Sequence, residues 1–174
     1  QEATIKEDDA IASLLEAEKL LQTGSVDEAM KAAEASLQTE TEDKNIHAGA
    51  HAILVKGYLI KNDKTAALAQ IDELMVYLSE HMAPMSRPML VGLTLKAEVY
   101  MVNGRYEQAL KDFDAFFEVY ETLSDVALQA ELKPLHDEAM DKRGHLLLMS
   151  GDKEAIFSHY KNWVENQGDE PTDL

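Results

Sequence analysis

The amino-acid sequence predicts an all-α fold, built as a row of about four antiparallel helix hairpins. The 174 residues include only 8 Gly and 4 Pro, and residues that favour helices, such as Ala, Leu, Met, Glu, Lys and Gln, are abundant. Apolar residues recur at spacings of three and four, which is the helical period, and we find no convincing strand pattern. A helix, a tight turn and a second helix also recur along the chain, as expected of a repeat architecture.

The first hairpin begins with a helix that ends at Thr23-Gly24, because Gly readily takes the left-handed conformation that closes a helix. This helix carries a stripe of mostly apolar residues: Ile11, Leu14, Leu15, Glu18 and Leu21. The segment Ser25-Val26-Asp27-Glu28 is typical of a capping box, in which the Ser hydroxyl and the Glu carboxylate accept hydrogen bonds from amides at the helix start. We therefore expect the second helix to begin at Ser25.

The same pattern recurs in segments 20–30, 58–68, 100–110 and, more weakly, 147–156. Each segment has an apolar or aromatic residue, a Gly or Asn turn, and then an Ala followed by an aliphatic residue. The turn residues are Gly24, Asn62, Gly104 and Gly151, at intervals of about 38 to 47 residues. Since one hairpin cannot bury its apolar face alone, we expect successive hairpins to stack into a continuous core.

Segment 97–113 carries the most specific pattern. Ala97 is a small first-helix residue, Tyr100 is aromatic, Gly104-Arg105-Tyr106 forms the turn, Ala109 lies at the helix crossing and Phe113 is the second-helix aromatic residue. This segment resembles a tetratricopeptide repeat, and degenerate copies extend the resemblance over about residues 8–166. The resemblance implies a right-handed α-solenoid of about four hairpins in a single domain, residues 1–166, followed by a polar flexible tail, residues 167–174.

The intervals exceed the roughly 34 residues of standard repeats, so longer helices or connections must absorb the excess. Segment 39–45 is a polar connection, and segment 81–89 carries two prolines that end one helix and start the next. Ser124-Asp125 is expected to cap a further helix. That helix either continues through Pro134 or is restarted by it, which makes the first helix of the last hairpin unusually long.

The chain is strongly acidic, with a formal net charge of -17 and no Cys. This charge repels phosphate backbones and anionic lipids, so we expect no nucleic-acid partner. No apolar run reaches the roughly 18 residues of a spanning helix, so we expect no membrane insertion. The lack of Cys leaves the compartment open. A signal peptide ahead of Gln1 would make the protein periplasmic or exported, and otherwise we expect it in the cytoplasm.

Catalysis is not expected. The sequence contains no G-x-S-x-G, Walker, G-x-G-x-x-G or EF-hand motif. The adjacent pairs His136-Asp137 and Ser158-His159 do not supply a triad, because neighbours on a helix point about 100° apart. We therefore predict that the protein is not an enzyme and that it uses no cofactor.

Two clusters are weak candidates for metal binding. His47 and His51 share one helix face, a spacing that suits zinc, copper or nickel, but no third ligand is evident. His81 and three methionines around the prolines (Met82, Met85 and Met89) form the soft ligand set that cuprous copper prefers. The favoured interpretation is structural: two histidines at the core margin and methionines that fill gaps between helices.

The repeat resemblance also implies a binding site, because in such repeats the first helix of each hairpin lines a concave groove. The residues implied to face the ligand are Leu14, Glu18 and Leu21, then Ala52, Lys56 and Leu59, then Thr94, Glu98 and Met101, and finally Asp141, His145 and Leu148. These residues are mostly apolar with few cations. Only Lys56 suits the clamp with which chaperone-binding members of the family hold a C-terminal carboxylate.

The most favoured function is therefore a non-catalytic interaction or scaffold module that binds a protein or peptide, with any basic flank attracted by the acidic surface. One alternative is a periplasmic or secreted accessory protein that handles a metal or small ligand. A second is a helical homodimeric subunit, because solenoid ends expose apolar faces. The groove residues could instead pack against the last helix, whose apolar stripe comprises Phe157, Tyr160, Trp163 and Val164.

Overall fold

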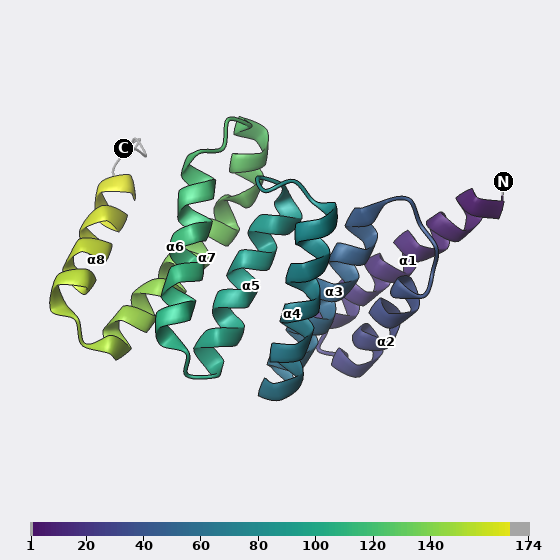
Figure 1. Cartoon of the computed structure of the whole chain (residues 1–174), viewed down its shortest axis with the longest axis horizontal. Coiled ribbons are helices and arrows are strands. Elements are labelled where there is room, and N and C mark those ends of the chain that lie inside the picture. The colour runs from purple at the N-terminus through teal and green to yellow at the C-terminus, as the bar shows by residue number, and fades with distance from the viewer. Residues whose placement is uncertain (1, 168–174) are drawn as a thin grey trace, which may run out of the picture.

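The computed structural model describes residues 2–167, and the side chains of residues 8–165. The described chain forms eight α-helices arranged in a row (Figure 1): α1 (Glu2–Gln22), α2 (Val26–Leu37), α3 (Lys44–Ile60), α4 (Lys64–His81), α5 (Arg87–Val102), α6 (Tyr106–Glu121), α7 (Val126–Ser150) and α8 (Lys153–Gln167). The predicted all-α class is confirmed. The tail expected over residues 167–174 lies outside the described residues, apart from Gln167, which ends α8.

The helices pack as four sequential hairpins, α1–α2, α3–α4, α5–α6 and α7–α8, as the sequence predicts. Each hairpin also contacts the next one, because α2 packs on α3, α4 on α5 and α6 on α7. The first helices form a layer of their own, in which α1 contacts α3, α3 contacts α5 and α5 contacts α7. The last helix, α8, contacts only α7 within the described chain and forms one end of the row.

All four predicted turn residues adopt the left-handed conformation. Their φ angles are +85° at Gly24, +55° at Asn62, +72° at Gly104 and +73° at Gly151, and within the described range no other residue has a positive φ. In the first three hairpins the two amides at the turn donate to carbonyls of the last helical turn, for example Arg105 to Tyr100 at 2.8 Å. This bonding satisfies carbonyls that a helix end would otherwise leave unpaired.

Small residues occupy the buried crossings, as the repeat pattern predicts. Ala29, Ala67 and Ala109 follow the first three turns, and all three are completely buried. A small side chain at this position lets two helix backbones approach closely. The corresponding Ala155 of α8 is only half-buried, so the fourth hairpin closes less tightly than the others.

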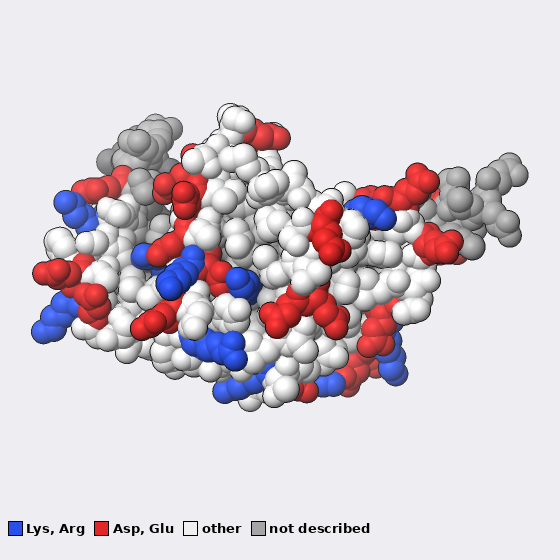
Figure 2. All heavy atoms as spheres, viewed as in Figure 1, with Lys and Arg blue, Asp and Glu red and all other residues white. Residues whose placement is uncertain are grey.

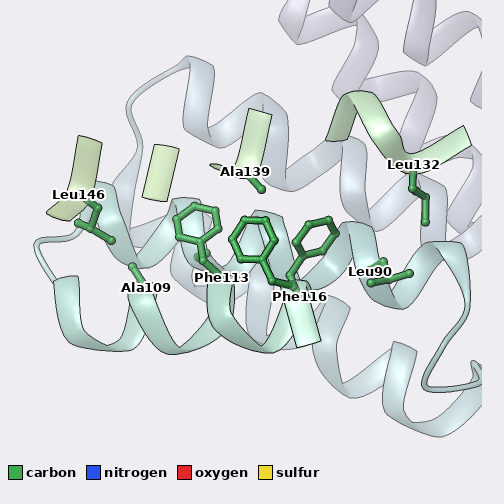
Figure 3. Close-up of a cluster of buried hydrophobic side chains, with 9 residues drawn as sticks. Leu90, Ala109, Phe113, Phe116, Leu132, Ala139 and Leu146 are labelled. Atoms are coloured by element: carbon green, nitrogen blue, oxygen red, sulfur yellow. The ribbon is translucent and has the colours of Figure 1, made fainter. Parts of the chain in front are cut away.

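The apolar interior forms three clusters that follow the order of the hairpins. One joins α1, α2 and α3 through residues such as Met30 and Ile53, and another joins α3, α4 and α5. The third joins α5, α6 and α7, where Phe113 and Phe116 point from α6 toward Ala139 of α7 (Figure 3). Both phenylalanines are completely buried, which makes this cluster rich in aromatic area.

The capping of α2 differs from the prediction. The Ser25 side chain makes no capping hydrogen bond at the start of α2, so the predicted capping box is wrong. Other helices are capped by side chains: Asp63 accepts from the Ala66 amide at 3.0 Å, and Asp125 accepts from the Leu128 amide at 3.0 Å. At Ser25 the backbone amide instead donates to the Leu20 carbonyl, so the turn itself holds the start of α2.

The predicted connections are confirmed, and one open alternative is decided. The polar connection ends at Asp43, whose carboxylate accepts from the Asn45 amide at 2.9 Å, and Pro88 lies in the first turn of α5. Pro134 lies inside α7, which continues through it over 25 residues. The last hairpin therefore has an extended first helix rather than two short ones.

Candidate functional site

A groove of about 670 Å³ crosses the layer of first helices and is lined by all four of them. We refer to it as the groove. Its lining residues are Glu18, Leu21 and Gln22 of α1; Ile53, Lys56, Leu59 and Ile60 of α3; Arg87, Val91, Thr94, Leu95 and Glu98 of α5; and Glu131, Leu132, Pro134, Leu135 and Glu138 of α7.

The groove runs obliquely across these helices. On α1 and α3 it is lined near the turn ends, as by Leu21 and Leu59, whereas on α5 it is lined by the middle and the start of the helix. On α7 it is lined only by the first half of the helix, from Glu131 to Glu138. The second half of α7 instead carries α8, because buried His159 of α8 lies against Gly144.

The floor of the groove is apolar and consists of buried core side chains. Ile53, Leu95 and Leu132 line it, and each also belongs to the buried core. Thr94 is the buried polar residue of the floor, and its hydroxyl donates to the Val91 carbonyl of its own helix at 2.9 Å. The only hydroxyl hydrogen of Thr94 is used within its own helix, so the floor offers an occupant no side-chain donor at Thr94 and favours apolar contacts.

Ion pairs fix most of the charged rim. Arg87 Nε lies 2.8 Å from Glu131 Oε1, which joins α5 to α7. Lys142 Nζ lies 2.7 Å from both Glu98 and Glu138. Burial lowers the pKa of Lys142, but the charges and hydrogen bonds of these two glutamates outweigh it and hold that pKa above its usual value.

Two charged side chains at the turn end of the groove are not fixed in this way. Glu18 of α1 and Lys56 of α3 are exposed, and neither has an ion-pair partner among the described residues. The groove thus has four glutamates and two cations in its lining. Acidic side chains also lie along the whole length of the face shown in Figure 2.

The structure brings together six of the twelve residues implied by the repeat resemblance: Glu18, Leu21, Lys56, Leu59, Thr94 and Glu98. The other six lie elsewhere. Leu14 packs against Gly49, Ala52 packs in the cluster of α3, α4 and α5, and Met101 packs against the third core cluster. The last three, Asp141, His145 and Leu148, are exposed on the second half of α7, outside the groove lining.

The largest group of lining residues that sequence reasoning missed lies on α7. Glu131, Leu135 and Glu138 lie far from the turn at Gly151, whereas the resemblance implied residues just before it. The available signal was the length of this helix, which the sequence predicted to be enlarged around Pro134. A longer helix reaches the groove with a different segment.

The last helix does not fill the groove. No residue of α8 within the described range lines it, so the alternative in which the groove packs against this helix is wrong. Four apolar residues of α8 remain solvent-exposed instead: Phe157 at 70%, Tyr160 at 39%, Trp163 at 38% and Val164 at 62%.

A second hollow, of about 390 Å³, lies between α6, α7 and α8. Arg143 crosses it, with Nε 2.7 Å from Asp114 Oδ1 and Nη1 2.9 Å from His159 Nδ1. Burial and the Arg143 charge lower the pKa of His159. A neutral His159 can accept the hydrogen bond from Arg143 at Nδ1.

The candidate histidines gather around one tyrosine. The rings of His47, His51 and His81 lie 6.1, 5.5 and 4.5 Å from that of Tyr77. His47 Nε2 lies 3.0 Å from the Thr39 carbonyl, and His51 Nδ1 lies 2.9 Å from the side-chain amide of Gln70. Burial lowers the pKa of His51. Each ring nitrogen named here already has a partner within the chain.

The candidate methionines are dispersed. Met82 and Met89 pack against the apolar cluster of α3, α4 and α5, whereas Met85 is exposed. Among the described residues there is no group of three or more His, Cys, Asp or Glu side chains that could hold a metal ion. The packing agrees with gap-filling by Met82 and Met89.

One of the two side-chain pairs considered for catalysis does form a contact. His136 Nδ1 lies 3.0 Å from Asp137 Oδ1, so the expectation that these neighbours point apart is wrong. The His136 ring also packs against Phe117 and Tyr120, at 5.3 and 4.6 Å between ring centres. Ser158, which carries the hydroxyl of the other pair, is exposed on α8.

Comparisons with known proteins add no family. No family model matches the chain, and no curated protein or solved structure matches it either. Over the part of the chain that is described, no helix has both the length and the apolar character needed to cross a bilayer. Interpretation of the function therefore depends on the residues and their geometry.

Proposed function

We propose that this protein is a non-catalytic interaction or scaffold module, an α-solenoid of degenerate tetratricopeptide type that holds a peptide or a partner helix in the groove. The observation that carries the proposal is that the first helices of all four hairpins line one groove. A surface shared by every hairpin is what a repeat array offers to an extended ligand.

The chemistry of the groove supports an elongated apolar ligand. Its floor consists of buried side chains such as Ile53 and Leu95, and core packing holds these in place before any ligand binds. Preorganised apolar surface lowers the entropic cost of association. The oblique course across α1, α3, α5 and α7 favours a ligand that follows several helices over a compact small molecule.

A peptide selected on the protein tests this proposal. Peptides from a random displayed library are selected on the wild-type chain, and the affinity of the tightest one is measured by calorimetry. Ile60→Asp places a charge in the groove at a side chain that is 58% exposed, so the fold is retained. We expect it to weaken binding at least about tenfold, because an unpaired charge is desolvated under the ligand.

Val76→Asp is the matched control. Val76 is 57% exposed on α4 and does not line the groove. We expect this variant to bind the peptide as the wild type does. Equal loss in the two variants, or no loss in Ile60→Asp, would place the binding surface elsewhere and contradict the proposal.

A further inference from the structure

The end of the row carries an uncovered apolar surface. Phe157, Tyr160 and Val164 follow one another at helical spacing on α8, and we call them the α8 stripe. Aromatic side chains carry about 150–250 Å² each, so a Phe that is 70% exposed leaves a large apolar area in water. Contiguous surface of this kind marks an interaction site in a folded protein.

The stripe has no route to the groove of its own chain. His159 is buried against α7, where it lies within reach of Gly144 and bonds to Arg143, so α8 is held on the second half of α7. The groove uses the first half of that helix. Reaching it within one molecule would require these buried contacts to break.

The groove and the stripe have complementary chemistry. Lys153 continues the stripe toward the start of α8, and Lys161, which lies 3.8 Å from Glu165 of the same helix, flanks it one turn after Phe157. The groove presents an apolar floor with glutamates at its edge, of which Glu18 has no cation partner in the described chain. An apolar helix face flanked by lysines therefore fits an apolar groove edged by glutamates.

From this match we propose that a second copy of this chain places its α8 stripe in the groove, in a reciprocal homodimer. The inference rests on the proposed function, because it assumes that the groove accepts a helix. Two reciprocal contacts bury twice the area of one, and they close the assembly at two copies. The dimer covers its own grooves, so a partner peptide must compete with α8.

The test measures mass by light scattering and sedimentation over a range of concentrations. We expect the wild-type chain to show a monomer–dimer equilibrium. Phe157→Asp on the stripe and Ile60→Asp in the groove each weaken that dimer at least about tenfold. Both side chains are more than half exposed, so both variants fold. Val76→Asp is the control and dimerises like the wild type.

Mixing the two variants identifies the contact. A Phe157→Asp chain keeps its groove and an Ile60→Asp chain keeps its stripe, so an equimolar mixture can form one of the two contacts. We expect a dimer in the mixture that neither variant forms alone at the same concentration. Any one of three results would overturn the inference. These are a dimer that Ile60→Asp leaves intact, a mixture that stays monomeric, and a wild type that is monomeric at every concentration.

This result is separable from that of the proposed function. Monomeric Phe157→Asp still presents an open groove, so the selected peptide should bind it at least as tightly as it binds the wild type. If the wild type is monomeric and still binds the peptide, only the proposed dimer is contradicted. If the chain forms a dimer with the expected mixing behaviour but no peptide binds through the groove, only the proposal of an external ligand is contradicted.

Discussion

Helices α6 and α8 both follow a left-handed glycine turn, yet their aromatic residues lie in opposite environments. Phe113 and Phe116 of α6 are completely buried, whereas Phe157 of α8 is 70% exposed and Trp163 is 38% exposed. The difference follows from their neighbours, because α6 lies between α5 and α7 while α8 has only α7. In a row of hairpins, burial depends on the next hairpin as much as on the helix itself.

The two helices also differ in the residue that anchors them. At the same distance from the turn, α6 has Asp112 and α8 has His159, and both are buried. Asp112 Oδ1 lies 3.1 Å from Lys96 Nζ, and His159 Nδ1 lies 2.9 Å from Arg143 Nη1. Gln70 occupies this position in α4 and bonds to His51. A buried polar contact between the two helices thus recurs in three hairpins.

The largest effect on stability is expected when an aromatic residue is removed from α6. Phe116→Ala should lower the free energy of unfolding by about 3–5 kcal/mol, because it leaves a cavity in the third core cluster. Phe157→Ala on α8 should change it by less than about 0.5 kcal/mol in the monomer, because the side chain is already solvated. Urea unfolding at low protein concentration measures both. Similar losses would contradict the assigned difference in burial.

A smaller effect is expected from the anchor of α6. Asp112→Ala should cost about 1–3 kcal/mol, because Lys96 lies half-buried and would lose its carboxylate partner. Asp114→Ala on the same helix serves as the comparison. Asp114 is 56% exposed in its pair with Arg143, so its loss should cost less than about 1 kcal/mol. The reverse order, read from the same unfolding curves, would show that Asp112 is not an anchor.

The anchor of α8 should respond to pH. Burial and the Arg143 charge lower the pKa of His159 in the folded state, so the unfolded chain binds a proton more readily. The stability from this group is complete above the ordinary histidine pKa of about 6.5 and is lost as the pH falls below it. Hydrogen exchange, corrected for intrinsic rates, should show several-fold weaker protection of α8 at acidic pH.

Two substitutions sharpen that pH test. His159→Gln installs the residue found at this position in α4 and should weaken the pH dependence of α8 protection. His145→Gln alters an exposed histidine on α7 and should leave the dependence unchanged. A pH dependence that survives His159→Gln would assign the effect to another group.

The smallest effects on stability are expected from substitutions at the helix caps. Asp125→Ala removes the acceptor for the Leu128 amide and should cost about 1 kcal/mol. Ser25→Ala removes a hydroxyl that makes no capping bond and should cost less than about 0.5 kcal/mol. Thermal unfolding of the two variants checks the difference. Equal destabilisation would mean that Ser25 does cap α2 in solution.

Much of the fold could be predicted from the sequence, because its signals are local. Left-handed closure needs Gly or Asn, so Gly24, Asn62, Gly104 and Gly151 mark the hairpin turns directly. The exception at Ser25 is instructive, since the Ser and Glu pattern is present but backbone bonds of the turn hold the helix start. Local sequence indicates where a helix begins more reliably than which group satisfies its first amides.

Positions in the groove were less predictable, because they depend on how helices cross. The repeat pattern implied residues just before each turn, and this succeeded for Leu21 and Leu59, whose helices meet the groove near their turn ends. It failed on α7, where Glu131 and Leu135 line the groove far from the turn. The extra length of α7 moves its turn end away from the groove, and no local pattern specifies that displacement.

The central claim is that one groove across the first helices is the binding surface. Amide and methyl chemical-shift mapping of the labelled chain, titrated with the selected peptide, tests it most directly. We expect the largest shifts at groove residues on all four first helices: Leu21, Leu59, Val91 and Leu135. Largest shifts around Val76 and Tyr77 on α4, with the groove residues unchanged, would contradict the claim.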